Sequence, residues 1–132
     1  MKASSFDPLA GGCAILTGVA AFLYAVAFII VARTNLVLGG TLSSLFLLLL
    51  GLLYSAALTA VYERLRETNP ATALWAFDLG IAGAIGASIH GGYALANFLN
   101  PPAGAASDLP SQIDPRGRLT FAVAGLSVFI IS

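Results

Sequence analysis

Long stretches without charge constrain this chain more than any other feature of its sequence. The stretches 8–32 and 41–62 contain no charged residue, and only 9% of the 132 residues are charged, against roughly 25% in a soluble domain. A helix that spans the hydrocarbon core of a membrane needs about 20 mostly apolar residues. The sequence therefore predicts an all-α protein, a polytopic transmembrane helical bundle of about four helices.

The predicted helices form a single domain, and proline and capping residues mark their ends. We expect helices at about 8–33, 41–66, 70–99 and 115–132. A capping residue directly precedes a proline at three predicted starts: Asp7-Pro8, Asn69-Pro70 and Asp114-Pro115. The side-chain oxygen can accept a free N–H of the first turn, and proline loses no hydrogen bond there. Thr41 after two glycines is the expected cap of the second helix.

The predicted connections differ in length. About eight residues join the first two helices and a few join the next two, so both pairs should be antiparallel neighbours. The last apolar run, 119–132, would be only about 21 Å long as a helix, against a core of about 30 Å. We therefore expect the last helix to be truncated and the chain to continue beyond Ser132. Lys and Arg divide equally between the two sides, so orientation stays open.

Small residues recur at helical spacing in the third predicted helix. They are Gly80, Ala84, Ser88, Gly92 and Ala96, beside a second row of Gly83, Ala87 and Gly91. Because lipid is as apolar as leucine, transmembrane helices associate where small residues let backbones approach. The pattern predicts helix packing and favours 70–99 as the central helix. Glycines also occur where a ligand approaches the backbone.

His90 is the only histidine and lies within the third predicted helix. Ionisable residues inside a membrane are rare and often functional. One interpretation is a neutral imidazole hydrogen-bonded to a neighbouring helix. The others are a proton or substrate role, or an axial ligand of a pigment or haem. In the last case Gly86, one turn earlier, would leave room for the macrocycle, as in the Ala-x-x-x-His pattern of light-harvesting polypeptides that this segment loosely resembles.

Other polar residues on this helix extend the candidate binding site. Tyr93 and Asn97 follow His90 at helical spacing, so the three residues form a polar strip. Asp78 lies twelve residues before His90, about 18 Å away along the helix, so the two cannot form a dyad there. We expect Asp78 at the headgroup level, with Trp75 as an aromatic anchor; the alternative is an arginine partner inside the bundle.

The sequence contains no arrangement typical of an enzyme. It has no metal-ligand spacing, phosphate loop or pair of nucleophile and base, so we expect neither catalysis nor a bound metal. The net charge is zero and no basic cluster is present, which argues against nucleic acid as a partner. The single cysteine, Cys13, allows no disulfide within the chain.

Three segments carry a family resemblance: His90-Gly91-Gly92-Tyr93, the run Leu95–Pro102, and Asp114-Pro115-Arg116-Gly117. With these, most of the chain resembles a family of uncharacterised bacterial multi-pass membrane proteins. The resemblance implies about six helices, two of them beyond Ser132, and a place in the bacterial cytoplasmic membrane. It implies no activity and no functional residues.

Three functions remain open from the sequence. The first is a structural or accessory subunit of a membrane complex, with the lipid bilayer and other membrane subunits as partners. The second is a carrier or channel module for a small solute, using His90, Tyr93, Asn97 and Asp78. The third is a pigment- or haem-binding membrane protein, with His90 as the ligand and otherwise no cofactor.

Overall fold

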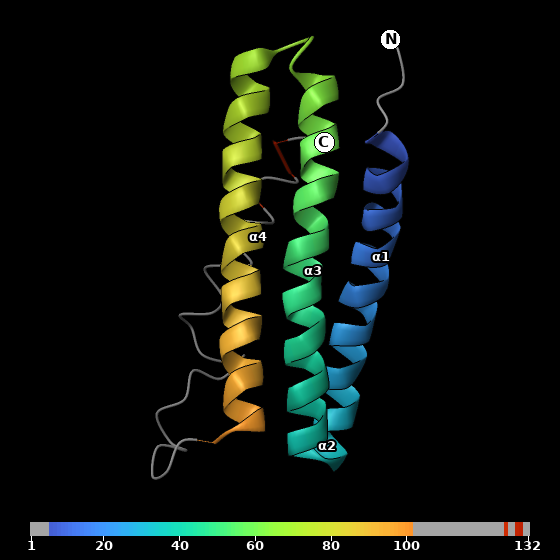
Figure 1. Cartoon of the computed structure of the whole chain (residues 1–132), viewed down its shortest axis with the longest axis vertical. Helices are drawn as coiled ribbons and strands as arrows, with labels where there is room; N and C mark the ends of the chain where they lie inside the picture. The colour runs from blue at the N-terminus through green and yellow to red at the C-terminus, as the bar shows by residue number, and fades with distance from the viewer. Residues whose placement is uncertain (1–5, 102–125, 127–128, 131–132) are drawn as a thin grey trace.

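A computed structural model describes residues 6–101, 126, 129 and 130 of the chain. Within these residues the protein is all-α, which confirms the predicted fold class. Three long helical rods lie side by side (Figure 1). The predicted fourth helix, 115–132, lies almost entirely outside the described residues, of which only 126, 129 and 130 belong to it.

The first rod consists of three consecutive helical segments. They are α1 (Asp7–Val26), a π-helical turn η1 (Ala27–Val31) and the short α2 (Ala32–Thr34). A π-helical turn is rare and appears mostly as a single bulge inside an α-helix. The rings of Tyr24 and Phe28 stack just before and within this turn, with centroids 5.9 Å apart and planes 3° from parallel.

The connection between the first two rods is a single residue, Asn35, and the expected eight-residue loop is wrong. The side chain of Asn35 accepts a hydrogen bond of 3.0 Å from the backbone N–H of Leu38 and caps α3 (Leu36–Leu65). Thr41 is therefore not a cap; it lies inside α3, and its hydroxyl donates to the carbonyl of Val37 at 2.7 Å. Gly39 and Gly40, which suggested a loop in the sequence, are residues within this helix.

The caps of the other two rods differ from each other. Asn69 accepts a hydrogen bond of 3.2 Å from the N–H of Thr72 and caps α4 (Pro70–Leu99), which confirms that prediction. The expected cap at Asp7 is wrong, because Asp7 is the first residue of α1 and no side-chain bond caps that helix. Its carboxylate instead approaches Arg64 on α3.

The described rods form a row with α3, rather than the expected 70–99, in the middle; the predicted fourth helix lies almost entirely outside the described residues. Within the described residues α3 contacts both α1 and α4, whereas α1 and α4 do not contact each other (Figure 1). Neighbouring rods run antiparallel, as the short connections predict. The two sides of α3 serve different neighbours: Gly39 lies against Ala32 of α2, and Gly40 lies against Phe98 of α4.

Glycines bring α3 and α4 into close contact. A Cβ on Gly91 would lie 2.5 Å from the backbone nitrogen of Leu48 and 2.8 Å from the carbonyl oxygen of Ser44. A Cβ on Gly51 would collide with the side chain of Ser88 and the carbonyl oxygen of Ala84. Without side chains at these positions the backbones approach closely, as small residues allow in membranes.

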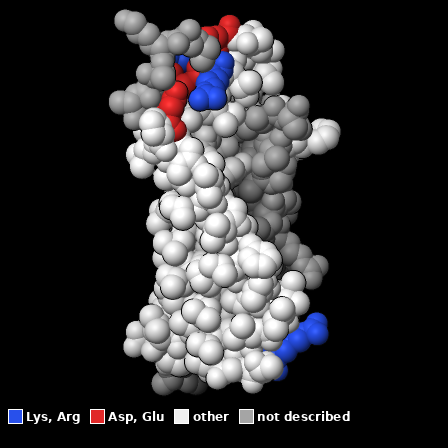
Figure 2. Space-filling model, turned by 90° about the vertical axis from the view of Figure 1, so that its right-hand side faces the viewer, with Lys and Arg blue, Asp and Glu red and all other residues white. Residues whose placement is uncertain are grey.

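Three helical stretches are long and apolar enough to cross a membrane: Asp7–Thr34, Leu36–Leu65 and Pro70–Leu99. At about 1.5 Å per residue, such helices of 28 or 30 residues exceed a hydrocarbon core of about 30 Å and reach into both headgroup layers. On the face drawn in Figure 2, the charged side chains of the described residues lie at the ends of the rods, with an uncharged surface between.

Replacing the residue between the first two rods tests its capping role. We expect Asn35→Ala to lower the free energy of unfolding by about 1 kcal/mol, because the N–H of Leu38 loses its acceptor. Unfolding in mixed detergent micelles, followed by circular dichroism, measures the change. Asn100→Ala, just after α4, is the matched control and should change stability by less than about 0.5 kcal/mol. Equal losses in both variants would contradict the capping role of Asn35.

Candidate functional site

His90 lies on α4, deep within the span. It is nine residues before the end of the helix at Leu99, which is about 14 Å. Its level is that of Leu48 on α3, because the next residue, Gly91, touches Leu48. The ring is half-buried, and its Nε2 atom is buried without a hydrogen-bond partner among the described residues. In hydrocarbon a polar atom without a hydrogen bond costs free energy. A hydrogen-bonding partner for this nitrogen would therefore stabilise the protein.

Asn97 presents the same situation two turns further along α4. Seven residues separate it from His90, so the two side chains lie on nearly the same side of the helix, about 10 Å apart along it. The amide nitrogen of Asn97 is buried and has no hydrogen-bond partner in the described part of the chain. Ser44, on the side of α3 that meets Gly91, has a buried hydroxyl in the same condition.

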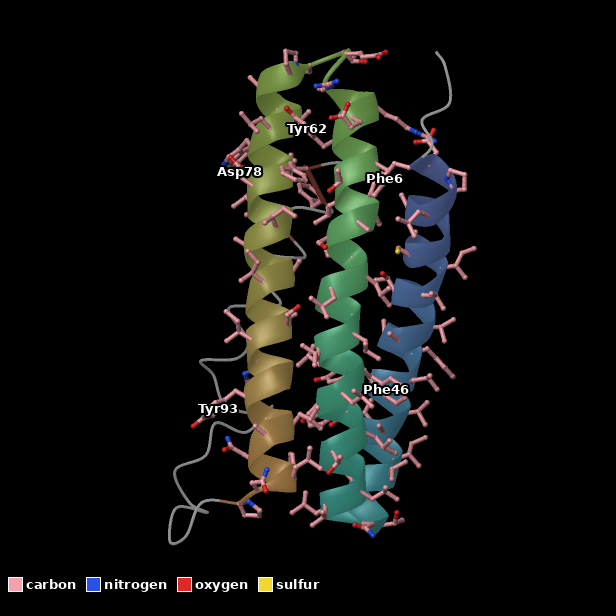
Figure 3. All side chains as sticks on the ribbon, in the orientation of Figure 1. Phe6, Phe46, Tyr62, Asp78 and Tyr93 are labelled. Atoms are coloured by element: carbon pink, nitrogen blue, oxygen red, sulfur yellow. The ribbon has the colours of Figure 1, made fainter. Side chains whose placement is uncertain are left out.

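Tyr93 does not share this buried side. Its side chain is exposed and points away from α3 (Figure 3). The predicted polar strip is therefore divided: the structure places His90 and Asn97 on a half-buried side of α4 and Tyr93 on an outer side. In a membrane the phenol of Tyr93 faces lipid or another protein.

Asp78 lies near the charged end of the molecule. Its neighbour Phe77 contacts Tyr62 of α3, with ring centroids 5.0 Å apart, and Tyr62 directly precedes Glu63. Asp78 is exposed. In Figure 3 it lies at the same height as Phe6, the residue that precedes α1. Among the described residues Asp78 has no ion-pair partner.

The small residues of α4 divide between two environments. Gly80 and Ala84 are buried, Ser88 and Gly92 are half-buried, and Ala96 is exposed. The hydroxyl of Ser88 donates to the carbonyl of Ala84 at 3.0 Å and lies 3.5 Å from the carbonyl of Leu48 on α3. The second row is buried throughout, at Gly83, Ala87 and Gly91. The close contact with α3 thus involves members of both rows.

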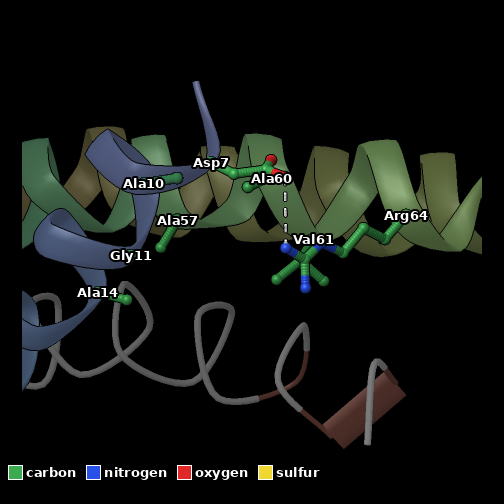
Figure 4. A pocket seen from close by; sticks show the side chains of 8 residues that line it. All are labelled: Asp7, Ala10, Gly11, Ala14, Ala57, Ala60, Val61 and Arg64. Carbon is green, nitrogen blue, oxygen red and sulfur yellow. Dashed lines mark ion pairs between the residues drawn. The ribbon is translucent and has the colours of Figure 1, made fainter. Parts of the chain in front are cut away.

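The most distinctive charged feature is one that the sequence analysis did not find. At the headgroup end, Asp7 of α1 and Arg64 of α3 form an ion pair of 3.6 Å at one end of a groove of about 220 Å³ (Figure 4). Small side chains from both helices line the groove. The two residues are 57 positions apart in the sequence, and Asp7 resembles a helix cap, so no local pattern indicates that they meet.

The described residues show how the titratable side chains are distributed. They contain no group of three or more His, Cys, Asp or Glu side chains that could hold a metal ion. His90 and Asp78 are twelve residues apart on one helix and lie at different depths. The buried polar atoms without a described partner belong to Ser44, His90 and Asn97, and such groups can bind a ligand through hydrogen bonds.

These features define a class of protein: three long apolar helices with charges at their ends indicate an all-α integral membrane protein. No protein-family model, no curated protein and no solved structure matches the chain.

Proposed function

We propose that the chain is a structural or accessory subunit of a membrane complex, and that α1 is the helix that contacts its partners. We further propose that it is a multi-pass protein of the bacterial cytoplasmic membrane, as the resemblance of its sequence implies. The observation that carries the proposal is a contrast among the glycines of the chain.

Glycines in the middle rod have close neighbours, whereas those of α1 do not. A Cβ on Gly39, Gly40 or Gly51 would collide with an adjoining helix. A Cβ on Gly11 or Gly18 would meet nothing within 4 Å. Within the described residues, these α1 glycines therefore serve no close contact.

A glycine inside a helix costs up to about 1 kcal/mol relative to alanine, so an unused glycine is a disadvantage. Gly11 and Gly18 are seven residues apart and lie on one side of α1, with Gly11 at the rim of the groove between α1 and α3. Two large apolar residues lie on the same side: Ile15, between the two glycines, is 71% exposed, and Phe22, one turn after Gly18, is 68% exposed. Notches flanked by large apolar side chains fit a second transmembrane helix, because the backbones can then approach closely.

The size of the native complex tests this proposal. Extracted in a mild detergent, the wild-type protein should migrate on a native gel as an assembly larger than a single chain. Gly18→Leu should shift it to the single-chain position, because the leucine fills the notch. The shift should occur with an unchanged helical circular dichroism spectrum, since nothing within the described chain lies against Gly18.

Leu16→Phe is the matched control, because it adds bulk to an exposed position of α1 that is turned away from the glycine side. It should leave the assembly intact. A wild-type protein that migrates as a single chain would refute the subunit proposal. An assembly that survives Gly18→Leu would refute the role of α1.

A second candidate function is ligand binding at His90, which the unpaired Nε2 atom favours. A carrier or channel module would use this nitrogen and Asn97 for a small solute, and a pigment or haem would use it as an axial ligand. If the subunit proposal holds, the purified protein should show no visible absorption band. A Soret or bacteriochlorophyll band that disappears in His90→Leu would instead establish pigment binding.

A further inference from the structure

We infer that the groove between α1 and α3 binds one phospholipid with a primary ammonium headgroup, of the phosphatidylethanolamine class. Arg64 holds the phosphate, Asp7 holds the ammonium, and an acyl chain fills the groove. This site shares Gly11 with the α1 surface described above but not Gly18, and it does not depend on the proposed function.

The groove exists because its walls are small. Ala10, Gly11 and Ala14 of α1 and Ala57 and Ala60 of α3 line it, and these five residues have at most a methyl group each. The two helices remain neighbours, and the missing side-chain volume leaves a space of about 220 Å³ between them. A space without partner atoms forfeits dispersion contacts, and an acyl chain restores them.

The depth of the groove suits a lipid. The groove begins at the first turn of α1 and at Arg64, the second-to-last residue of α3. It continues toward the middle of the span to the level of Ala14 and Ala57, about 10 Å further in. A headgroup at the ion pair would therefore place its acyl chain alongside the alanines.

The ion pair at the end of the groove is loose and accessible. Arg64 and Asp7 are 3.6 Å apart, and their side chains are 63% and 32% exposed. Strong pairs of this kind are about 2.7–2.9 Å long, a length that Arg66 and Glu63 reach at 2.7 Å at the end of α3. Both members of the loose pair can accept another partner, because a guanidinium has five N–H donors and a carboxylate accepts several hydrogen bonds.

Charge complementarity selects the headgroup. A phosphate accepts hydrogen bonds from Arg64, while the carboxylate of Asp7 requires a cation that donates hydrogen bonds. A primary ammonium does so, whereas the quaternary ammonium of a choline headgroup has no N–H and a glycerol headgroup has no positive charge. Glu63 is paired with Arg66, so the charges at the groove are those of Arg64 and Asp7, which match a zwitterionic headgroup.

Native mass spectrometry of the purified full chain measures this selectivity. Phosphatidylethanolamine, phosphatidylcholine and phosphatidylglycerol with identical acyl chains are titrated in turn. We expect phosphatidylethanolamine to bind at least tenfold more tightly than the other two. Asp7→Asn and Arg64→Gln should each weaken it roughly tenfold, because each removes a charged hydrogen-bond partner.

Ala14→Phe tests the groove itself. Ala14 is exposed at the groove wall, so the added ring can fill the space without entering the contact with α3. We expect this variant to lose the selective binding, while Leu16→Phe and Arg66→Gln keep it. Helical circular dichroism of each variant shows that the fold is retained.

Two lipid-binding results would overturn the inference. One is equal binding of the three lipids to the wild-type protein, which indicates only a non-selective lipid shell. The other is unchanged selectivity in Ala14→Phe with its helices intact, which places the lipid elsewhere. Neither result bears on the assembly that Gly18→Leu tests. A third result concerns the native complex. If Ala14→Phe dissociates the complex but removal of lipid does not, a partner helix rather than a lipid occupies the groove.

Discussion

Replacing Gly51 by leucine should separate α3 from α4. Even a Cβ at this position collides with the hydroxyl of Ser88 and the carbonyl oxygen of Ala84, and one of these atoms belongs to the backbone of α4. A flexible side chain can move away, but a helix backbone must move as a whole. Overpacking usually costs about 1–3 kcal/mol and sometimes more, and we expect a loss of about 3 kcal/mol or more here.

Unfolding in mixed micelles gives the size of this loss. Gly12→Leu is the matched control, since a Cβ on Gly12 meets nothing within 4 Å. It should change the free energy of unfolding by less than about 0.5 kcal/mol. If Gly51→Leu is as stable as the wild type, the close approach of α3 and α4 at this level is wrong.

Leu47→Asp should prevent α3 from taking its place in the membrane. Leu47 is 0% exposed and lies about 5 Å from the middle of the helix. A charged aspartate near the centre of a span costs roughly 2.5–3.5 kcal/mol in insertion, and the packing of leucine is lost in addition. Because α3 is the only described contact between α1 and α4, its loss should leave both helices without a neighbour.

The yield of folded protein in the membrane fraction, and resistance of that protein to protease, measure this effect. Leu47→Met keeps the volume and the apolar character and should cost less than about 1.5 kcal/mol. A folded, protease-resistant Leu47→Asp protein would show that this position is not buried among helices.

The sequence predicted the helices because an uncharged stretch of sufficient length has few alternatives. The expected span 70–99 agrees with α4, and the expected 41–66 differs from α3 mainly at its start. The error there has a physical reason. Gly39 and Gly40 suggest a turn in water, but in this bundle they are helical positions against Ala32 and Phe98. A glycine pair looks the same in the sequence whether it serves a turn or a contact.

The order of the helices could not be predicted in the same way. Small residues are most regular in α4, which suggested a central helix, yet one regular row needs only one neighbour. The leucine-rich α3 distributes its small residues over two sides, with Gly39 toward α2 and Gly40, Ser44 and Gly51 toward α4. Such a distribution indicates a middle helix, but it becomes visible only when the neighbours are known.

The candidate sites were predictable only where they depend on one helix. The spacing of His90 and Asn97 places them on the same side of α4, and the structure leaves a buried polar atom of each without a described partner. Burial of the two side chains, and the exposure of Tyr93, depend on what lies beside α4. The pair of Asp7 and Arg64 depends on the register between two helices, which no sequence spacing reveals.

The single-residue turn at Asn35 has a consequence for how the hairpin of α1 and α3 enters a membrane. At the turn the hairpin has one charge, Arg33, while its open end has Asp7, Glu63, Arg64, Arg66 and Glu67. One end must be translocated during biogenesis, and each charge that crosses must first shed its water. The turn is by far the easier end to move, so we expect Arg33 on the far side and the open end on the side of synthesis.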